Sequence, residues 1–439
     1  MEATEKKIGL IGAISIIVGT VIGASIFILL GPIAGQTGPS LFLAYLVAFL
    51  PALFGSFYYA QLGSAMPTNG GSYFYSKKLL NPLVGYITTI SLILGGLGAI
   101  VMLALGFAEY LQYFFPSLPI QFTAILIILV LYVINLLGLK TAEIVQIAMT
   151  VWILIGLLIF AIPGLFHVQV ENLTPLIPNG FGSFLMGSAL AVYSYVGYGI
   201  ISEIGGNIKN PQKNLPRSIF ISLGIVVVIY ALVSFVAVGV IPWEQLSASG
   251  ASVAEAAQLF LPAPVILFIS IGALFATVTT INAVMMTLPG DFKALANEGI
   301  FNSKMASKKV NGTLVVPVTI FSVVAIGGVL SGLSVDYFAT ITIVGLLLNT
   351  VVLGFAVYRL PQREPELFIN APFKMRIGLL RFTVFAGVLL NIVFILLAVM
   401  DVASIIVVYI IWIVGGYILH GRKIPKNSAR ITNQTVALK

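Results

Sequence analysis

Two stretches of the sequence decide the fold: SIIVGTVIGASIF at residues 15–27 and ALAVYSYVGYG at residues 189–199. Each lies in the middle of a long apolar run and concentrates glycine and hydroxyl-bearing residues there. Glycine weakens a helix by up to about 1 kcal/mol relative to alanine, so each stretch predicts a break within a helix. The alternative for either stretch alone is close packing of unbroken helices through small residues such as Gly19 and Gly23.

The rest of the chain has the composition of a membrane protein. Of its 439 residues, 59% are hydrophobic and 8% are charged, and the mean hydropathy is +1.10. A soluble domain is roughly a quarter charged because its surface must face water, so this composition excludes a soluble protein. The chain has no cysteine and two histidines, which leaves no disulfide, thiolate metal site or histidine cluster. The net charge of +8 is expected where basic residues gather on one side of a membrane, and it does not indicate nucleic acid binding.

Apolar runs long enough to cross a membrane as helices, which takes about 20 residues, recur along the whole chain. A β-barrel would instead show short alternating strands with much weaker signals. We therefore predict an all-α integral membrane protein, a single domain over residues 1–439, with twelve transmembrane helices. The twelve runs are 9–35, 40–64, 82–111, 122–139, 143–165, 180–205, 216–241, 264–288, 314–333, 336–358, 379–399 and 402–420.

The basic residues indicate the orientation of these spans. With the N-terminus in the cytoplasm, all 22 lysines and arginines fall in cytoplasmic segments or at the cytoplasmic ends of the adjoining spans, and the outer loops have none. One missed or invented span would destroy this asymmetry, because every later loop would change sides. We therefore expect a multi-pass protein of the cell (plasma) membrane with both termini cytoplasmic. The loop 65–81 predicts an interfacial helix, and the outer loop 242–263 predicts short helices over the outer face.

The two interrupted spans are the first and the sixth, which are corresponding positions in two five-helix halves, 9–165 and 180–358. Two extra helices follow at 379–420, and a polar tail at 421–439. A matched pair of glycine-interrupted spans is typical of a transporter built from an inverted repeat, with its binding site at the membrane midplane. The freed N–H groups of a broken helix favour a carboxylate, and its freed carbonyls favour an ammonium group. An α-amino acid carries both groups, so such a site needs no charged side chain.

Four motifs in order along the chain carry a resemblance to a known family. They are Gly23-Ala24-Ser25-Ile26-Phe27, Met66-Pro67-Thr68-Asn69-Gly70-Gly71-Ser72-Tyr73, Ile208-Lys209-Asn210-Pro211-Gln212-Lys213-Asn214-Leu215-Pro216 and Ala294-Leu295-Ala296-Asn297-Glu298-Gly299-Ile300-Phe301. They resemble the elements G-S/A-G-I-F, P-x-x-G-G-x-Y, V-K-N-P-x-R-N-x-P and A-x-A-x-D-G-x-F/L-P of the amino acid–polyamine–organocation (APC) superfamily. The resemblance implies a LeuT-type fold, a 5+5 inverted repeat with broken helices 1 and 6, and membrane transport of amino acids or close derivatives.

The resemblance also implies where a substrate binds. The carboxylate is expected near the backbone N–H groups of Ala24, Ser25 and Ile26, and the ammonium group near the carbonyls of Thr20, Val21, Tyr193 and Val196. Tyr193 stands where relatives often carry an aromatic side chain that closes over the substrate. Gly23 and Gly197 complete the predicted substrate site. The sequence departs from the family where Ser25 replaces a glycine, which would narrow the cavity.

The eighth span contains a candidate ion site. Phe275-Ala276-Thr277-Val278-Thr279-Thr280 resembles the stretch that binds sodium in sodium-coupled members of this fold. With carbonyls of the first helix break, the expected ligands are Gly19, Ile22, Ala276, Thr279 and Thr280. Ile153 stands where many proton-coupled relatives carry a lysine, so we favour sodium over a proton as the coupling ion. The alternative is that the threonine hydroxyls bond only to their own helix, four residues back.

Glu203, near the inner end of the sixth span, is the predicted gate residue. An acid within a span is a functional candidate, either as a salt bridge to an inner-loop lysine or arginine or as a proton carrier.

The predicted function is secondary active transport of a small or medium neutral L-amino acid by alternating access. The lack of a candidate acid in the pocket argues against a cationic side chain. Uncoupled amino acid exchange or polyamine antiport is the alternative, and a channel is a further one. An enzyme is not expected, because the spans offer no nucleophile–base pair or metal cluster. The expected partners are a free amino acid and membrane lipid; no nucleic acid, no cofactor beyond sodium and no oligomeric state are predicted.

Overall fold

A computed structural model describes residues 8–23, 25–68, 71–137, 142–203, 205–306, 309–310 and 313–420, which are almost entirely helical. The α-helices are α1 (Leu10–Val21), α2 (Ser25–Ile28), α3 (Leu30–Thr37), α4 (Leu41–Ala65), α5 (Gly71–Leu79), α6 (Pro82–Phe114), α7 (Ile120–Leu137), α8 (Ala142–Gly164), α9 (Gly180–Ala191), α10 (Ile200–Glu203), α11 (Pro211–Val240), α12 (Trp243–Ala248), α13 (Ser252–Ala257), α14 (Ala263–Asn297), α15 (Val315–Leu330), α16 (Val335–Arg363), α17 (Pro365–Asn370), α18 (Ile377–Asp401) and α19 (Ser404–His420). Short 3-10 helices are η1 (Gly38–Ser40), η2 (Leu165–His167), η3 (Val170–Leu173), η4 (Val192–Tyr195), η5 (Gly205–Asn207) and η6 (Ser303–Ala306), and strand β1 (Lys309–Val310) pairs antiparallel with β2 (Thr313–Leu314).

Helix occupies each of the twelve predicted ranges within the described residues. By length and composition, 8 helices could cross a membrane, and three shorter apolar helices lie at Ile120–Leu136, Val315–Leu330 and Ser404–Gly415. The remaining range, 180–205, is divided among α9, η4 and α10. The chain is therefore an almost entirely helical, multi-pass membrane protein, as predicted.

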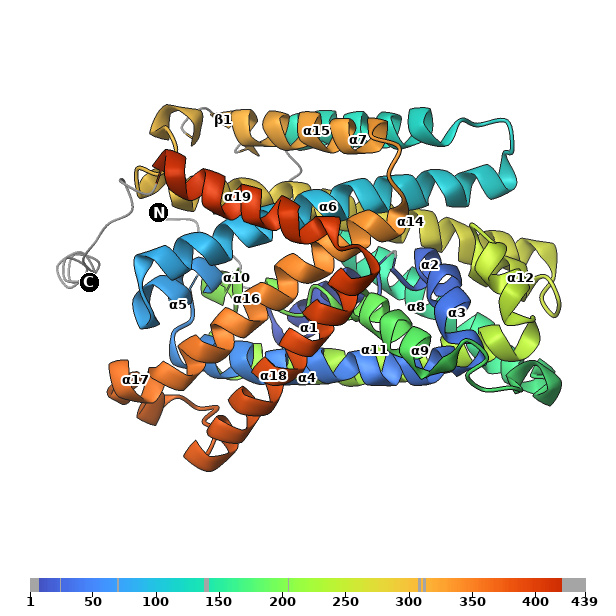
Figure 1. The fold of residues 1–439 in the computed structure, drawn as a ribbon, viewed down its shortest axis with the longest axis horizontal. Coiled ribbons are helices and arrows are strands. Elements are labelled where there is room, and N and C mark those ends of the chain that lie inside the picture. Colours follow the sequence, from blue (N-terminus) through green and yellow to red (C-terminus); the bar gives the residue numbers. More distant parts are fainter. Residues whose placement is uncertain are drawn as a thin grey trace.

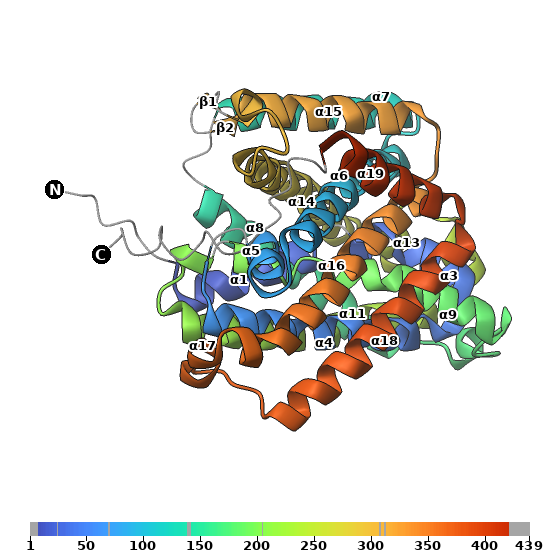
Figure 2. The same ribbon diagram turned by 60° about the vertical axis from the view of Figure 1, so that its left-hand side comes forward.

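The long helices run between two ends of the molecule (Figure 1). Helices α5 and α17 lie at one end, and α12 lies at the other. When the molecule is turned, α17 and α9 are again at opposite sides (Figure 2). Helix α5 is the helix predicted within 65–81, and α12 and α13 are the short helices predicted within 242–263. Helices α7 and α15 lie side by side at one edge in both views, joined by a 3.0 Å hydrogen bond between the hydroxyls of Tyr132 and Thr319.

Several helices run past the predicted spans because hydropathy locates the apolar part of a helix and not its end. Helix α14 continues to Asn297, beyond the predicted limit of 288, although it meets the charged residues Asp291 and Lys293 there. Helix α11 begins at Pro211, five residues before the predicted start, because proline at the first helical position gives up an N–H that would be unpaired anyway. These extensions carry polar side chains beyond the apolar part of the bundle.

Both predicted helix breaks are present. Helix α1 ends at Val21, and helix resumes at Ser25 as α2; Ala24, between them, lies outside the described residues. In the sixth range, η4 gives way to an extended Val196, and Gly197 follows with φ of +111°. That backbone conformation is one that side chains with a β-carbon rarely adopt, so a glycine is required at this position. Helix resumes at Ile200 as α10.

Candidate functional site

The two helix breaks lie against one another in the interior of the bundle. A β-carbon at Gly197 would lie 2.8 Å from Cγ2 of Thr20, which is closer than real side-chain carbons approach. The absence of a side chain at Gly197 therefore allows the sixth span to contact the last turn of α1. Sequence reasoning paired the two breaks from their positions in the chain, and the structure brings them together in space.

A single side chain, Tyr230 of α11, joins the two breaks. Its hydroxyl oxygen lies 2.6 Å from the carbonyl oxygen of Val21 and 2.8 Å from that of Ser194. Ser25 Oγ lies 3.2 Å from the same hydroxyl. Tyr230 has one proton to donate to either carbonyl, while its oxygen can accept from Ser25. The end of α1, the start of α2 and the sixth-span break are thus held by one fully buried tyrosine.

Sequence reasoning missed Tyr230. It stands in the apolar run Ile225-Val226-Val227-Val228-Ile229-Tyr230-Ala231, where it reads as one more core aromatic residue. The only signal in the sequence was a hydroxyl group at midspan. Such a group needs a hydrogen-bond partner within the protein, because lipid tails offer none. Two neighbouring tyrosines pack against Tyr230: the ring centroids of Tyr45 and Tyr195 lie 5.4 and 5.3 Å from that of Tyr230. The hydroxyl of Tyr195 donates a hydrogen bond to the carbonyl of Tyr45 at 2.9 Å.

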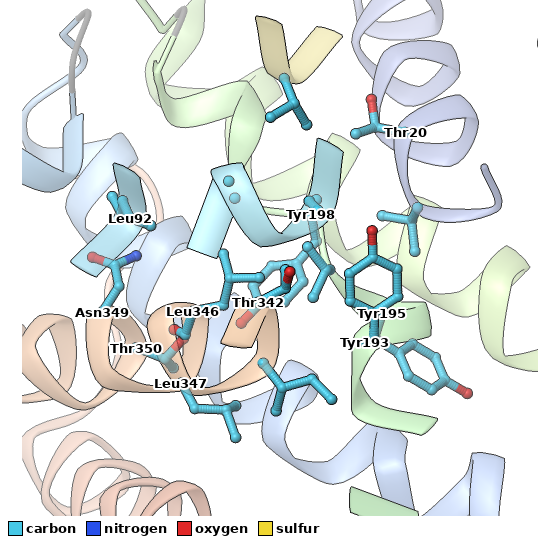
Figure 3. A pocket seen from close by; sticks show the side chains of 18 of the residues that line it. Thr20, Leu92, Tyr193, Tyr195, Tyr198, Thr342, Leu346, Leu347, Asn349 and Thr350 are labelled. Atoms are coloured by element: carbon cyan, nitrogen blue, oxygen red, sulfur yellow. The ribbon is translucent and has the colours of Figure 1, made fainter. Parts of the chain in front are cut away.

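A cavity of about 180 Å³ opens beside the breaks (Figure 3). Helices α4, α5, α6, α14 and α16 complete its wall, and most of the lining side chains are apolar. The aliphatic ones include Leu92, Ala99, Leu103, Leu346 and Leu347. The polar ones include Thr342, Asn349 and Thr350 of α16, and Asn349 Nδ2 donates to the hydroxyl of Tyr59, also a lining residue, at 2.7 Å.

Most of the predicted substrate residues reach this cavity. Those that line it are Thr20, Val21, Ser25, Tyr193, Val196 and Gly197. Gly23 packs against α14 instead, Ile26 is fully buried away from the cavity lining, and Ala24 lies outside the described residues. The carbonyl of Tyr193 already accepts the N–H of Val196 at 2.9 Å, so it has one lone pair left for a further donor.

The predicted ion ligands divide into two groups. A β-carbon at Gly23 would overlap Thr280 Oγ1, so Thr280 lies directly against the first helix break, and it lines the cavity. Thr280 donates its proton to the carbonyl of Ala276 at 2.8 Å, and Thr279 lies within 3.0 Å of the same carbonyl. These are the hydrogen bonds within the helix that are expected if the threonines do not bind an ion. Each hydroxyl oxygen still keeps a lone pair with which to bind a cation. The second group is Gly19 and Ile22, which are both buried. Gly19 lies in the last turn of α1, and Ile22 directly follows that helix.

The predicted gate residue, Glu203, ends α10, and its side chain lies outside the described part of the structure. The ion pairs that the structure describes at this end involve other acids. Lys77 of α5 pairs with Glu298 at the end of α14, and Lys78 pairs with Glu364 at 3.2 Å. Burial, reinforced by the Glu298 carboxylate, raises the pKa of Tyr73 above its ordinary value, so this phenol stays protonated.

One expectation about the pocket is wrong: it does contain an acid. Asp291 of α14 lines the cavity and is half-buried. The prediction failed because the apolar run of the eighth span was taken to end at 288, which placed Asp291 in a loop. The helix continues instead and carries this carboxylate into the cavity wall.

Comparison with known proteins identifies the family. The family model described as amino acid permease matches residues 8–422, so the chain belongs to this family, part of the APC superfamily, as the four motifs indicated. Its members are transporters and not enzymes, which also agrees with the sequence analysis.

Three relatives illustrate the range of the family. The chain is 26% identical over 389 residues to the branched-chain amino acid permease BcaP of Bacillus subtilis, covering 83% of each chain. It is 26% identical over 430 residues to the methylthioribose transporter of Bacillus subtilis, covering 92% of this chain and 91% of the relative. It is 27% identical over 325 residues to the chloroplastic cationic amino acid transporter 9 of Arabidopsis thaliana, covering 69% of this chain and 57% of the relative.

The contacts of Tyr230 lead to a first prediction. Tyr230→Phe removes the hydroxyl that joins both helix breaks, and losing a buried hydrogen bond costs about 1–3 kcal/mol. We expect the Kd for the transported amino acid to rise roughly tenfold, measured by calorimetry on the purified protein.

Tyr58→Phe is the matched control for this variant. It also removes a buried tyrosine hydroxyl bonded to a backbone carbonyl, that of Thr383 at 2.8 Å, but this carbonyl belongs to α18 and not to a helix break. It should lower stability and leave the Kd unchanged. Equal Kd values for Tyr230→Phe and the wild type would contradict the role assigned to Tyr230.

Proposed function

We propose that the protein is a secondary active transporter that moves a small or medium neutral L-amino acid across the membrane by alternating access. The observation that carries the proposal is the meeting of two helix breaks at one cavity. Freed backbone N–H and C=O groups there suit a carboxylate and an ammonium group held close together. The described lining residues from α1, α2 and the sixth-span break are all uncharged, as a zwitterion requires.

The cavity wall supports an aliphatic side chain for the substrate. Leu92, Ala99, Leu103, Leu346 and Leu347 surround the space beside the breaks, and apolar surface favours apolar groups of the substrate. The likeness to a branched-chain amino acid permease agrees with this proposal. Other relatives are named for methylthioribose or cationic amino acids, so the family alone supports no single substrate.

The orientation of the cavity supports alternating access. Ser72 of α5 and Asp291 of α14 line it at one end, whereas α12 and α13 at the opposite end contribute none of the described lining residues. At that opposite end α3 packs tightly on α12: a β-carbon at Gly31 would lie 2.9 Å from the carbonyl oxygen of Leu246. A carrier open toward one side and closed toward the other would have this form.

For the membrane topology we propose twelve spans in a LeuT-type arrangement, with both termini cytoplasmic and the protein in the cell membrane. All 22 basic residues then lie on the cytoplasmic side, which the positive-inside rule favours. The end of the molecule that carries α5 and α17 would face the cytoplasm.

For the coupling ion we propose sodium, bound between the first helix break and α14. The contact of Gly23 with Thr280 supports this, because it sets a hydroxyl oxygen and the nearby carbonyl of Ala276 beside the last turn of α1. Sodium favours such neutral oxygen ligands, and Gly19, Ile22 and Thr279 would supply the others.

For the gate we propose Glu203, pairing with a basic residue on the cytoplasmic side. Its neighbour Ser202 supports this, because the carbonyl oxygen of Ser202 would lie 3.1 Å from a β-carbon at Gly71 of α5. The end of α10 therefore lies beside the helix that carries Lys77 and Lys78.

Transport itself is tested by uptake into proteoliposomes, with the substrate found in a thermal-shift screen of all amino acids. Ala99→Phe fills part of the cavity, so we expect the ratio of leucine to alanine uptake to fall at least tenfold. Ala148→Phe, on the exposed face of α8, is the control and should keep the wild-type ratio. Absence of saturable uptake and counterflow for every amino acid would contradict the proposed function; saturable counterflow without a driving gradient would favour exchange.

The topology is tested by cysteine labelling, since the chain has no cysteine of its own. We expect Ser331→Cys, exposed between α15 and α16, to react with an impermeant reagent in intact cells. Gln212→Cys, exposed at the start of α11, should react only after permeabilisation. Labelling of Gln212→Cys from outside would overturn the orientation.

The coupling ion is tested with Thr280→Val, which removes one proposed ligand oxygen. If sodium binds there, sodium and the amino acid should raise each other's affinity by the same factor, because linkage is reciprocal. In Thr280→Val the sodium concentration for half-maximal uptake should rise roughly tenfold. Thr277→Val is the control: its hydroxyl makes the same kind of within-helix bond, to Ala273 at 2.9 Å, but does not line the cavity. Equal uptake in sodium, potassium and choline media would refute sodium coupling.

A further inference from the structure

One side-chain amide on the cavity wall has an oxygen atom without a hydrogen-bond partner. Asn349 of α16 is 1% exposed and lines the cavity, where it lies on the side of Leu92 (Figure 3). Its Nδ2 donates to the hydroxyl of Tyr59 at 2.7 Å, whereas its Oδ1 accepts no hydrogen bond from any described residue. An amide nitrogen carries two protons, so Asn349 can offer a second N–H beside this oxygen.

This amide lies close to the break in the sixth span. A β-carbon at Gly199 would lie 2.9 Å from the same Tyr59 hydroxyl, so Tyr59 stands between Asn349 and the segment just beyond the break. The ring of Tyr59 also packs edge-on against that of Tyr198, with the two centroids 5.7 Å apart. Because these contacts hold the Tyr59 ring in place, its hydroxyl holds the amide of Asn349 in a defined orientation.

Asn349 differs from the other polar side chains of α16 on this wall. The two threonines there, Thr342 and Thr350, donate their hydroxyl protons to carbonyls of their own helix at 3.0 and 2.9 Å. A buried carbonyl oxygen without a donor is costly, and folded proteins contain few of them. An unpaired acceptor on the wall of a binding cavity therefore points to a donor on the ligand.

We propose that Asn349 recognises a carboxamide side chain, so that the carrier takes L-glutamine or L-asparagine as well as aliphatic amino acids. A carboxamide presents a donor next to an acceptor, and a second carboxamide complements it by giving and taking one hydrogen bond. The methylene groups of such a substrate lie along the apolar wall, as an aliphatic side chain does. With an aliphatic substrate, water can bond to Asn349 instead. The inference rests on the proposed amino acid transport and adds to it a substrate class and the residue that selects it.

The test compares amino acids of similar shape with and without an amide. Leucine has the shape of asparagine, and methionine is close to glutamine in length. Each of these four L-amino acids competes in proteoliposomes with uptake of the labelled amino acid found in the thermal-shift screen, and the concentration that halves uptake is measured. Asn349→Leu replaces the amide by an apolar group of the same shape. The ratio of these concentrations, glutamine to methionine or asparagine to leucine, should therefore rise roughly tenfold.

Asn391→Leu is the matched control. Asn391 is also a fully buried asparagine whose Oδ1 accepts no hydrogen bond from the described residues, and its Nδ2 donates to the carbonyl of Gly387 at 2.6 Å. It lies on α18, which contributes none of the described lining residues, so both ratios should keep their wild-type values. Asn349→Ala is a second variant without the amide, in case Asn349→Leu does not fold, and it should raise the same ratio.

Each outcome has one meaning. Unchanged ratios for both pairs in Asn349→Leu or Asn349→Ala, with measurable uptake, would overturn the role of Asn349 and leave the transport function standing. A rise in Asn391→Leu equal to that in Asn349→Leu would also overturn it, because the effect would then follow from the loss of any buried asparagine. Wild-type uptake that leucine inhibits, but neither glutamine nor asparagine inhibits, would overturn it without any variant. Failure of the wild-type protein to take up any amino acid would instead contradict the proposed function.

Discussion

The fold depends on how two broken helices satisfy their backbone within an apolar bundle. An unpaired N–H or C=O group costs several kcal/mol in a medium without water, so a helix break deep in a membrane protein needs specific partners. Tyr230 supplies one hydroxyl to both breaks, within hydrogen-bonding distance of Val21 and Ser194. Because the same hydroxyl also contacts Ser25, the two ends of the first break and the sixth-span break are held as one unit.

Close packing makes this arrangement possible. Glycine at 197 lets the sixth span contact Thr20, and glycine at 23 lets the first span contact Thr280. The rest of the bundle packs similarly, since α6 and α16 approach closely where a β-carbon at Gly345 would lie 2.6 Å from the carbonyl oxygen of Ser91. Small residues at helix contacts are typical of membrane proteins, where packing and hydrogen bonds take the place of the hydrophobic effect between helices. The cavity is the space that these contacts leave beside the breaks.

The charged residues lie in different parts of the molecule from the helix breaks. They are few, and where the structure describes them they lie toward the ends of helices, as in the pairs Lys77–Glu298 and Lys78–Glu364. Both pairs join α5 to neighbouring segments at one end of the molecule.

The sequence by itself determined the membrane class, the positions of the helices, the two breaks and the family, because each rests on a local pattern: apolar runs, glycine clusters, basic loops and short motifs. It also located most of the cavity lining at the breaks, including Thr20, Val21, Ser25 and Gly197. The hydrogen bonds of Tyr230 and the position of Asp291 in the cavity wall were decided only by the tertiary structure. A tyrosine in an apolar run has no local sign of which distant carbonyls its hydroxyl will meet, and an acid just past an apolar run has no local sign that its helix continues along a cavity. Both roles depend on contacts between segments far apart in the chain, which only the packed bundle brings together.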